Sequence, residues 1–215
     1  MHTLYFALGT CALASHIALL DASAEYKLKR VDTGAGEQQS PDYLALNPKG
    51  RIPTLVTPQG SLSETPAILA FIAQSHPEAE LAPFDDPFTL AELQAFNSYL
   101  CSTVHVAHAH RMRGTRWVDD TVALEAMKKK VPETVSACFE LIDTQMLKGP
   151  WVMGKAYTIA DPYLFTLAQW MESDGIDPSR FQRVLDHRTR MAERPNTKTA
   201  LAEQGASLSG GCSIL

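Results

Sequence analysis

The sequence predicts a mixed α/β domain at the amino end of the chain and an all-α domain after it. Up to about residue 75, strand and helix patterns follow the order strand–helix–strand, then strand–strand–helix. Beyond that, no strand pattern is convincing, while apolar residues recur at helical spacing over residues 88–112 and 121–146. The segment between them is rich in proline and acidic residues and lacks periodicity. We therefore expect domains at residues 1–77 and 89–215, joined by a linker at residues 78–88.

Each element of the first domain has a local signal. Short apolar or alternating runs predict strands at residues 3–8, 26–31, 54–57 and 61–63. Leu13, Ile17 and Leu20 lie at helical spacing and predict a helix from Cys11 to Asp21. Another helix is expected to begin at Glu64-Thr65-Pro66, because the first helical turn does not need the N–H that proline lacks.

The second domain has a clear helix start and two shorter helical patterns. Thr158 and Asp161 have the spacing of a capping box, in which a hydroxyl residue is followed three positions later by an acid. An apolar helical run follows them. Further helices are predicted at residues 180–191 and 195–204.

Composition excludes several classes of function. The chain has 215 residues, of which 45% are hydrophobic and 20% charged, as in ordinary globular proteins with a real core. A net charge of −5 argues against the broad basic surface that nucleic acid requires. The four cysteines form no CxxC pair, which favours a reducing, cytoplasmic location. We expect neither a secretory signal nor a membrane span.

Two residues at the first strand–helix junction carry candidate chemistry. Cys11 stands where free N–H groups and the helix dipole favour an anion, so we expect its thiol pKa to be lowered. The alternative is a small residue buried under the sheet. The Thr10 hydroxyl could donate a hydrogen bond to a bound thiolate, or it could form part of the turn.

Two further positions could hold an extended peptide and its head group. Pro53 marks a strand start or a cis bond, and a cis bond would leave the Ile52 backbone free to pair with a ligand. A plain trans turn is the alternative. Glu64 and Thr65 stand where a hairpin strand enters a helix, so they could clamp an ammonium and a carboxylate group. Simple helix capping would explain the same residues.

These segments together resemble the cytosolic glutathione transferases, most closely those of the bacterial beta class. The resemblance is carried by the runs LYFALGTCALASHI at residues 4–17, YLALNPKGRIPTL at 43–55 and ETPAI at 64–68, and it returns with GKAYTIAD at 154–161. It extends over nearly the whole chain and is strongest in the first 75 residues. It implies a thioredoxin-like first domain, an all-helical second domain, a homodimer, and glutathione as a co-substrate bound between the domains.

The resemblance also implies roles for the residues that match the family motifs. Cys11 would lie near the glutathione sulfur, and the class is known to form a mixed disulfide there. The Ile52 main chain, beside a cis-Pro53, would pair with the cysteinyl part of glutathione. Glu64 and Thr65 would hold its γ-glutamyl end.

The first long helix of the second domain supplies further candidates. Asn97 and His105 match the beta-class helix that faces the thiol, and eight residues, a little over two turns, separate them, so both can face the cleft. The imidazole could lower the thiol pKa, and a satisfied helix histidine is the alternative. We expect Tyr99, Val104 and His108 to form the wall of the site for a hydrophobic substrate.

Two groups of basic residues near the end of that helix have competing explanations. The three histidines of residues 105–110 could suggest a metal, but only two share a helix face and no acid or thiol stands at ligand spacing, so no metal is expected. Arg111, Arg113 and Arg116 form a local basic cluster. Such a cluster is either a solvated or dimer-facing patch, or it attracts glutathione or an anionic substrate into the cleft.

The sequence therefore predicts a cytoplasmic glutathione transferase that joins glutathione to small hydrophobic electrophiles. Thr10, Cys11 and His105 are its expected catalytic residues. One alternative is a glutathione-dependent thiol–disulfide oxidoreductase that uses Cys11. Another is a non-catalytic carrier of glutathione or another ligand.

Overall fold

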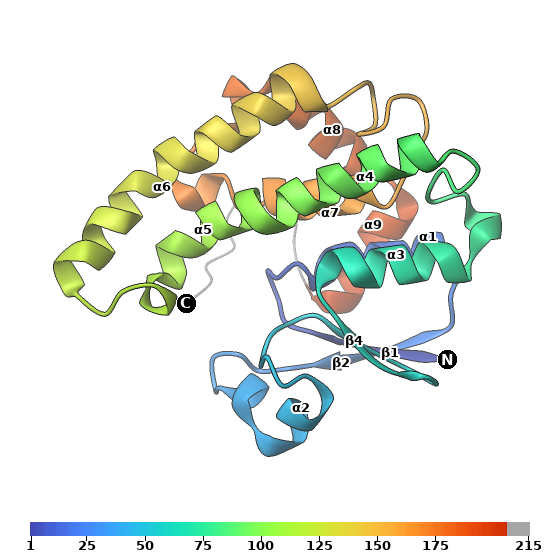
Figure 1. The fold of residues 1–215 in the computed structure, drawn as a ribbon, viewed down its shortest axis with the longest axis horizontal. Helices are drawn as coiled ribbons and strands as arrows, with labels where there is room; N and C mark the ends of the chain where they lie inside the picture. The colour runs from blue at the N-terminus through green and yellow to red at the C-terminus, as the bar shows by residue number, and fades with distance from the viewer. Residues whose placement is uncertain (206–215) are drawn as a thin grey trace.

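A four-stranded mixed sheet forms the amino-terminal part of the protein, as the computed structural model in Figure 1 shows. The structure describes residues 1–205, and Cys212 lies outside this range. The strand order is β2-β1-β3-β4, with β1 parallel to β2 and the other pairs antiparallel. The strands are β1 (His2–Phe6), β2 (Tyr26–Arg30), β3 (Thr54–Thr57) and β4 (Gly60–Ser63). The four predicted strands are thus present.

The first strand ends earlier than the sequence predicts, at Phe6 instead of Leu8. The Ala7 carbonyl accepts a hydrogen bond from the Thr10 hydroxyl at 2.8 Å, which closes a tight bend. Gly9 has a φ of +67° within this bend, a conformation that glycine adopts without a Cβ penalty. The bend therefore begins two residues before the end of the apolar run that predicted the strand, and it leads directly into the first helix.

Three helices pack on the sheet. α1 (Ala12–Asp21) and α3 (Thr65–Ser75) lie on the side that faces the helical domain, and α2 (Pro41–Leu46) lies on the other side (Figure 1). Every residue from Ala12 to Leu19 is buried, because α1 packs against the sheet and α3 on one side and against helices of the second domain on the other. The first helix therefore belongs to the interface between the two halves of the protein.

The connection between the two halves is tied down by backbone contacts. Leu81 is buried within it, and its carbonyl accepts a hydrogen bond from the Ile159 N–H at 2.9 Å. The next helix, α4, begins at Pro87, where the Asp86 carboxylate accepts from the N–H groups of Phe88 and Thr89. This is a side-chain N-cap of the usual kind.

The second half is entirely helical over residues 87–205 apart from short connections. Its helices are α4 (Pro87–Tyr99), α5 (His105–Met112), α6 (Thr121–Leu141), α7 (Ala160–Ala168), α8 (Gln182–Glu193) and α9 (Pro195–Gln204). The long helix predicted at residues 88–112 is interrupted by a π-helical segment, Leu100–Val104. Such a segment adds a residue per turn and shifts the faces of the helix on either side of it.

The capping box predicted at the start of α7 is confirmed. Asp161 is fully buried. Its Oδ2 accepts hydrogen bonds from the Thr158 N–H at 2.7 Å and from the Thr158 hydroxyl at 3.3 Å. Its Oδ1 accepts from the Val152 N–H at 2.8 Å and contacts Nε2 of His187 at 3.0 Å. One carboxylate thus joins three segments at the centre of the helical domain.

Candidate functional site

Cys11 occupies the N-terminal end of α1, and its side chain is almost completely buried. The thiol donates a weak hydrogen bond to the Ile52 carbonyl, with Sγ and O 3.6 Å apart. Burial raises the pKa of the Cys11 thiol to about 11, although the Thr65 side chain acts in the opposite direction. The predicted lowering of this pKa is therefore wrong for the structure as it stands. Desolvation of the thiolate outweighs the helix N-terminus here.

Thr10 is engaged in the bend that precedes α1. Its hydroxyl donates to the Ala7 carbonyl at 2.8 Å and accepts from the Ala12 N–H at 3.4 Å. Of the two roles left open by the sequence, the structure shows the turn. A bound thiolate would have to take the Thr10 hydroxyl proton away from the Ala7 carbonyl.

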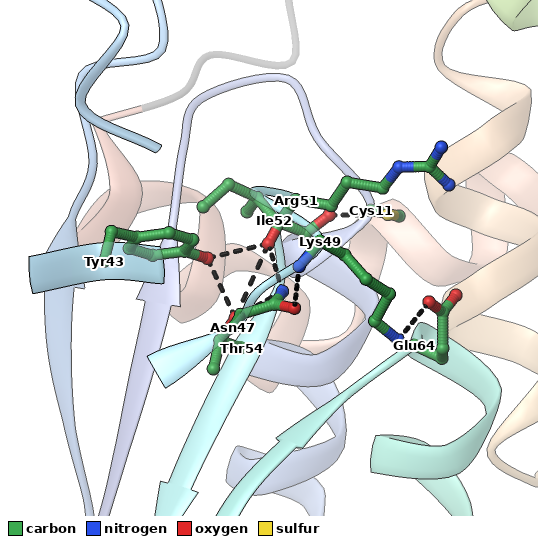
Figure 2. A network of polar contacts seen from close by, with 8 residues as sticks. All are labelled: Cys11, Tyr43, Asn47, Lys49, Arg51, Ile52, Thr54 and Glu64. Carbon is green, nitrogen blue, oxygen red and sulfur yellow. Dashed lines mark hydrogen bonds and ion pairs between the residues drawn. The ribbon is translucent and has the colours of Figure 1, made fainter. Parts of the chain in front are cut away.

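A buried polar network holds the backbone in front of Pro53, as Figure 2 shows. The Arg51 carbonyl accepts from the Tyr43 hydroxyl at 2.7 Å and from the Asn47 side-chain amide at 2.8 Å. Both of these side chains also bond to the Thr54 hydroxyl, at 2.8 and 3.0 Å. The Ile52–Pro53 bond is cis, which settles the alternative between cis and trans.

Glu64 and Thr65 lie at the start of α3, close to Cys11. Glu64 has φ +74° and ψ +119°, a left-handed conformation that is rare for a residue with a side chain. Its carboxylate pairs with the Lys49 ammonium at 2.6 Å, and both side chains are partly exposed (Figure 2). Thr65 is buried, and no side chain caps α3. The first turn of this helix is thus open to an anionic group.

Asn97 is completely buried in α4. Neither its side-chain oxygen nor its side-chain nitrogen has a hydrogen-bond partner within residues 1–205. An unpaired buried amide costs about 1–3 kcal/mol per group, so it calls for an explanation. Space for a ligand or a water at this position is the simplest one.

Positive charges act on His105, which lies in α5. Its ring stacks edge-on against Trp170, with centroids 5.2 Å apart. Burial, together with the charges of His108, Arg113, Arg116 and Arg51, lowers the pKa of His105 to about 4. The imidazole is therefore neutral at physiological pH. The groups whose charge acts on Cys11 are instead Cys101 and Glu64.

Two residues that the sequence reasoning missed lie near Cys11. Cys101 lies in the π-helical segment and Tyr163 in α7, and each side chain shifts the pKa of the other. Burial raises the pKa of Tyr163, and charges on Cys11, Cys101 and Glu64 raise it further. These groups thus meet where α1, α3 and the long helix come together. For Cys101 the sequence did offer a signal: it follows Asn97 by four residues, a spacing that places two residues on one helix face.

Of the three residues predicted to form the hydrophobic wall, Val104 and His108 are buried, and Tyr99 is half-buried. Val104 is completely buried in the core of the helical domain. His108 is buried as well and pairs with Asp174. The Tyr99 side chain contacts Cys138 on α6. The π-helical segment rotates the face that a regular helix would present.

The described part of the chain shows no candidate metal centre and no candidate membrane span. Within residues 1–205, no group of three or more His, Cys, Asp or Glu side chains is arranged to hold an ion. In the same range, no helix combines the length and the apolar character needed to cross a bilayer.

The fold is a thioredoxin-like α/β domain joined to an all-helical domain, and known proteins share it over their whole length. Family models match the chain for the glutathione S-transferase N-terminal domain over residues 1–74 and the C-terminal domain over residues 65–195. The chain belongs to the glutathione S-transferase family. The fold class and the family that the sequence predicts are therefore confirmed.

Three relatives illustrate the similarity. Glutathione S-transferase GstA of Escherichia coli O157:H7 is 30% identical over 205 residues, which are 94% of this chain and 98% of that protein. The crystal structure of a glutathione transferase homologue from Sulfitobacter, with bound glutathione, is 40% identical with a TM-score of 0.92, covering 96% of this chain and 99% of that one. A bacterial beta-class glutathione S-transferase of Sphingomonas chungbukensis is 30% identical with a TM-score of 0.83. The match covers 95% of this chain and 100% of that one.

Proposed function

We propose that this protein is a glutathione transferase, which joins the sulfur of glutathione to an electrophilic carbon of a second substrate. The observation that carries the proposal is the meeting of the starts of α1 and α3 beside the Ile52 carbonyl, with no side chain capping α3. Free N–H groups and helix dipoles at such starts favour anions. The similarity to a homologue solved with glutathione bound supports this ligand.

In the proposed complex, glutathione lies along the strip from Ile52 to Thr65. The main chain of Ile52 pairs with the cysteinyl part, as in strand addition. The Glu64 carboxylate receives the γ-glutamyl ammonium, and the N–H groups at the start of α3 receive its carboxylate. Asn97, with both amide atoms unpaired, provides hydrogen bonds from the opposite side.

The glutathione sulfur would then lie at the start of α1, near Thr10 and Cys11. Loss of the thiol proton to solvent gives a thiolate that the α1 N-terminus stabilises. The thiolate attacks the electrophilic carbon, the new S–C bond forms, and the leaving group departs. Lowering the thiol pKa toward 7 raises the thiolate fraction by roughly severalfold to tens-fold, and holding both reactants together supplies the rest of the acceleration.

Calorimetry and a conjugation assay together test this function. We expect glutathione to bind the wild-type protein with measurable heat and an activated aryl halide to be conjugated. Thr65→Val keeps the size of a buried side chain but removes its hydroxyl, and we expect it to weaken glutathione binding about tenfold. Lys129→Gln, on the exposed face of α6, serves as the control with unchanged binding. Absence of heat with millimolar glutathione would refute the proposal.

Thiol–disulfide exchange is a second candidate function, because Cys11 lies at the proposed sulfur position and a second thiol, Cys101, acts on its pKa. A cysteine thiolate would attack one sulfur of oxidised glutathione, form a mixed disulfide and release one molecule of glutathione thiolate. Intact-protein mass after exposure to oxidised glutathione tests this. An adduct of one glutathione that is lost in Cys11→Ala favours exchange at Cys11, and loss in Cys101→Ala assigns it to Cys101. No adduct in the wild type would rule exchange out.

We also propose a homodimer in the cytoplasm. Phe88, at the start of α4, is 74% exposed, and the nearby Phe84 is exposed as well. A second copy of the chain would cover these side chains. Light scattering should report a dimer for the wild type and a larger fraction of monomer for Phe88→Ser. A monomeric wild-type protein would contradict this assignment.

A further inference from the structure

One ion pair lies across the strip that the proposed function assigns to glutathione. The Nζ of Lys49 is 2.6 Å from Oε1 of Glu64. Lys49 stands three residues before Ile52, and Glu64 directly precedes α3. Figure 2 shows the Lys49 side chain extending from the loop in front of Pro53 to the Glu64 carboxylate. The ion pair therefore joins the two ends of the strip.

The backbone on each side of this ion pair is anchored. The Lys49 N–H donates to the side-chain oxygen of the buried Asn47 at 3.2 Å, and the Gly50 N–H donates to the Asn47 carbonyl at 2.9 Å. On the other side, the Glu64 carbonyl accepts from the Ile68 N–H at 3.0 Å, in the first turn of α3. Separation of the two charges therefore requires a movement of side chains only.

The ion pair itself costs little to open. The Lys49 side chain is 43% exposed and that of Glu64 49% exposed. Water and salt screen ion pairs with this much exposure, so each contributes little free energy. Within residues 1–205, neither side chain forms a second ion pair. Opening the pair leaves an ammonium group and a carboxylate, both without a partner, at one end of the strip.

An α-amino acid head group matches these two charges, because it carries an ammonium and a carboxylate on one carbon. Its ammonium can take the place of Lys49 on the Glu64 carboxylate. Its carboxylate can accept from the released Lys49 ammonium and from the N–H groups at the start of α3, which no side chain caps. A ligand with the ammonium alone breaks one ion pair and forms one, so its net gain is small. The arrangement therefore favours a head group with both charges.

We propose that Lys49 is a specificity-determining residue, which selects ligands with a zwitterionic head group by exchanging ion pairs at Glu64. In the free protein, Lys49 occupies the Glu64 carboxylate. In the complex, the γ-glutamyl ammonium occupies it and Lys49 binds the γ-glutamyl carboxylate. This inference rests on the proposed function, because it takes the γ-glutamyl end of glutathione to lie at Glu64 and Thr65.

Two ligands that differ by one carboxylate test the inference without turnover. The first is S-methylglutathione. The second has a 4-aminobutanoyl group in place of the γ-glutamyl group, so it lacks the α-carboxylate but keeps the ammonium, the S-methylcysteinyl part and the glycyl carboxylate. Calorimetry measures the affinity of each ligand for the wild type and for Lys49→Met, which keeps a long side chain and removes its charge.

The expected result is a change of opposite sign for the two ligands. Lys49→Met should bind S-methylglutathione about threefold more weakly, because the carboxylate loses an ion-pair partner, and the 4-aminobutanoyl ligand about threefold more tightly, because nothing competes for Glu64. The preference for S-methylglutathione should thus fall about tenfold. Lys49→Arg should keep most of the preference. Lys129→Met, on the exposed face of α6, is the matched control and should keep all of it.

Each contrary outcome has a distinct meaning. Equal weakening of both ligands in Lys49→Met would overturn the inference, since Lys49 would then only attract negatively charged ligands. Equal tightening would overturn it as well, since Lys49 would only block Glu64, and unchanged affinities would show that Lys49 has no part in binding. In these three cases the ligands still bind, and the proposed function stands. If neither ligand bound the wild type, the proposed function would fail and the inference with it.

Discussion

Asp161 and Asn97 are both completely buried polar residues of the helical domain, yet their surroundings are opposite. Asp161 receives hydrogen bonds from Val152, Thr158 and His187. Asn97 has no partner for either amide atom within residues 1–205. A buried group with all its bonds made belongs to the architecture, whereas a buried group with none made is in place for something else. The difference assigns the first residue to folding and the second to ligand binding.

Removal of the Asp161 carboxylate should produce the largest loss of stability. Asp161→Ala leaves the N–H groups of Val152 and Thr158 and the ring of His187 unpaired in the core, and we expect a loss of about 3–5 kcal/mol in the free energy of unfolding. Urea denaturation measures it. Asp186→Ala, on the exposed face of α8, is the control, with a change within about 0.5 kcal/mol. Equal effects of the two substitutions would contradict a central role for Asp161.

The polar network in front of Pro53 extends the same comparison to the first domain. Asn47→Ala leaves the Arg51 carbonyl with one bond fewer and deprives the buried Thr54 hydroxyl of a partner. We expect the protein to lose about 2 kcal/mol of stability and glutathione to bind more weakly. Chemical denaturation and calorimetry measure the two effects. Full glutathione affinity in this variant would show that the network does not shape the site.

Replacement of Asn97 should weaken ligand binding without a loss of stability. Asn97→Leu removes a polar group that has no partner, so we expect the free energy of unfolding to stay equal or to rise by about 1 kcal/mol. Glutathione affinity should fall about tenfold, because the proposed hydrogen bonds are lost. Ser98→Ala, at an exposed neighbouring position, is the matched control. A destabilised variant with normal glutathione affinity would reverse the assignment of Asn97.

His105 offers a smaller test that depends on pH. Burial lowers its pKa in the folded protein to about 4, whereas the unfolded chain takes up the proton near pH 6.5. The stability it contributes is therefore complete above pH 6.5 and is lost as the pH falls toward 4. His105→Gln should gain about 2 kcal/mol relative to the wild type at pH 5 compared with pH 8. A constant difference between the two proteins at all pH values would contradict the neutral imidazole.

The sequence predicted those features that local patterns determine. The alternation of β1, β2, β3 and β4 with helices follows from spacing, and the Thr158–Asp161 box follows from a hydroxyl and an acid three residues apart. The position of Cys11 at the start of α1 was equally accessible, since a glycine bend ends the strand before it.

The rest depends on packing between segments far apart in the chain. The pKa of Cys11 is raised because the helical domain covers the start of α1, which no local pattern shows. Val104 and His108, expected in the hydrophobic wall, are buried instead, and the π-helical segment Leu100–Val104 rotates the helix face there. The mutual influence of Tyr163, in α7, and Cys101, in that segment, on their pKa values has no sequence signal of its own. Site geometry is therefore less predictable than fold.

A crystal structure of the protein with glutathione tests the central claim most directly. The proposed function predicts glutathione with its cysteinyl amide about 3 Å from the Ile52 carbonyl, its γ-glutamyl end at Glu64 and Thr65, and its sulfur at the Thr10–Cys11 bend. Glutathione bound elsewhere, or with its sulfur directed away from the start of α1, would contradict it.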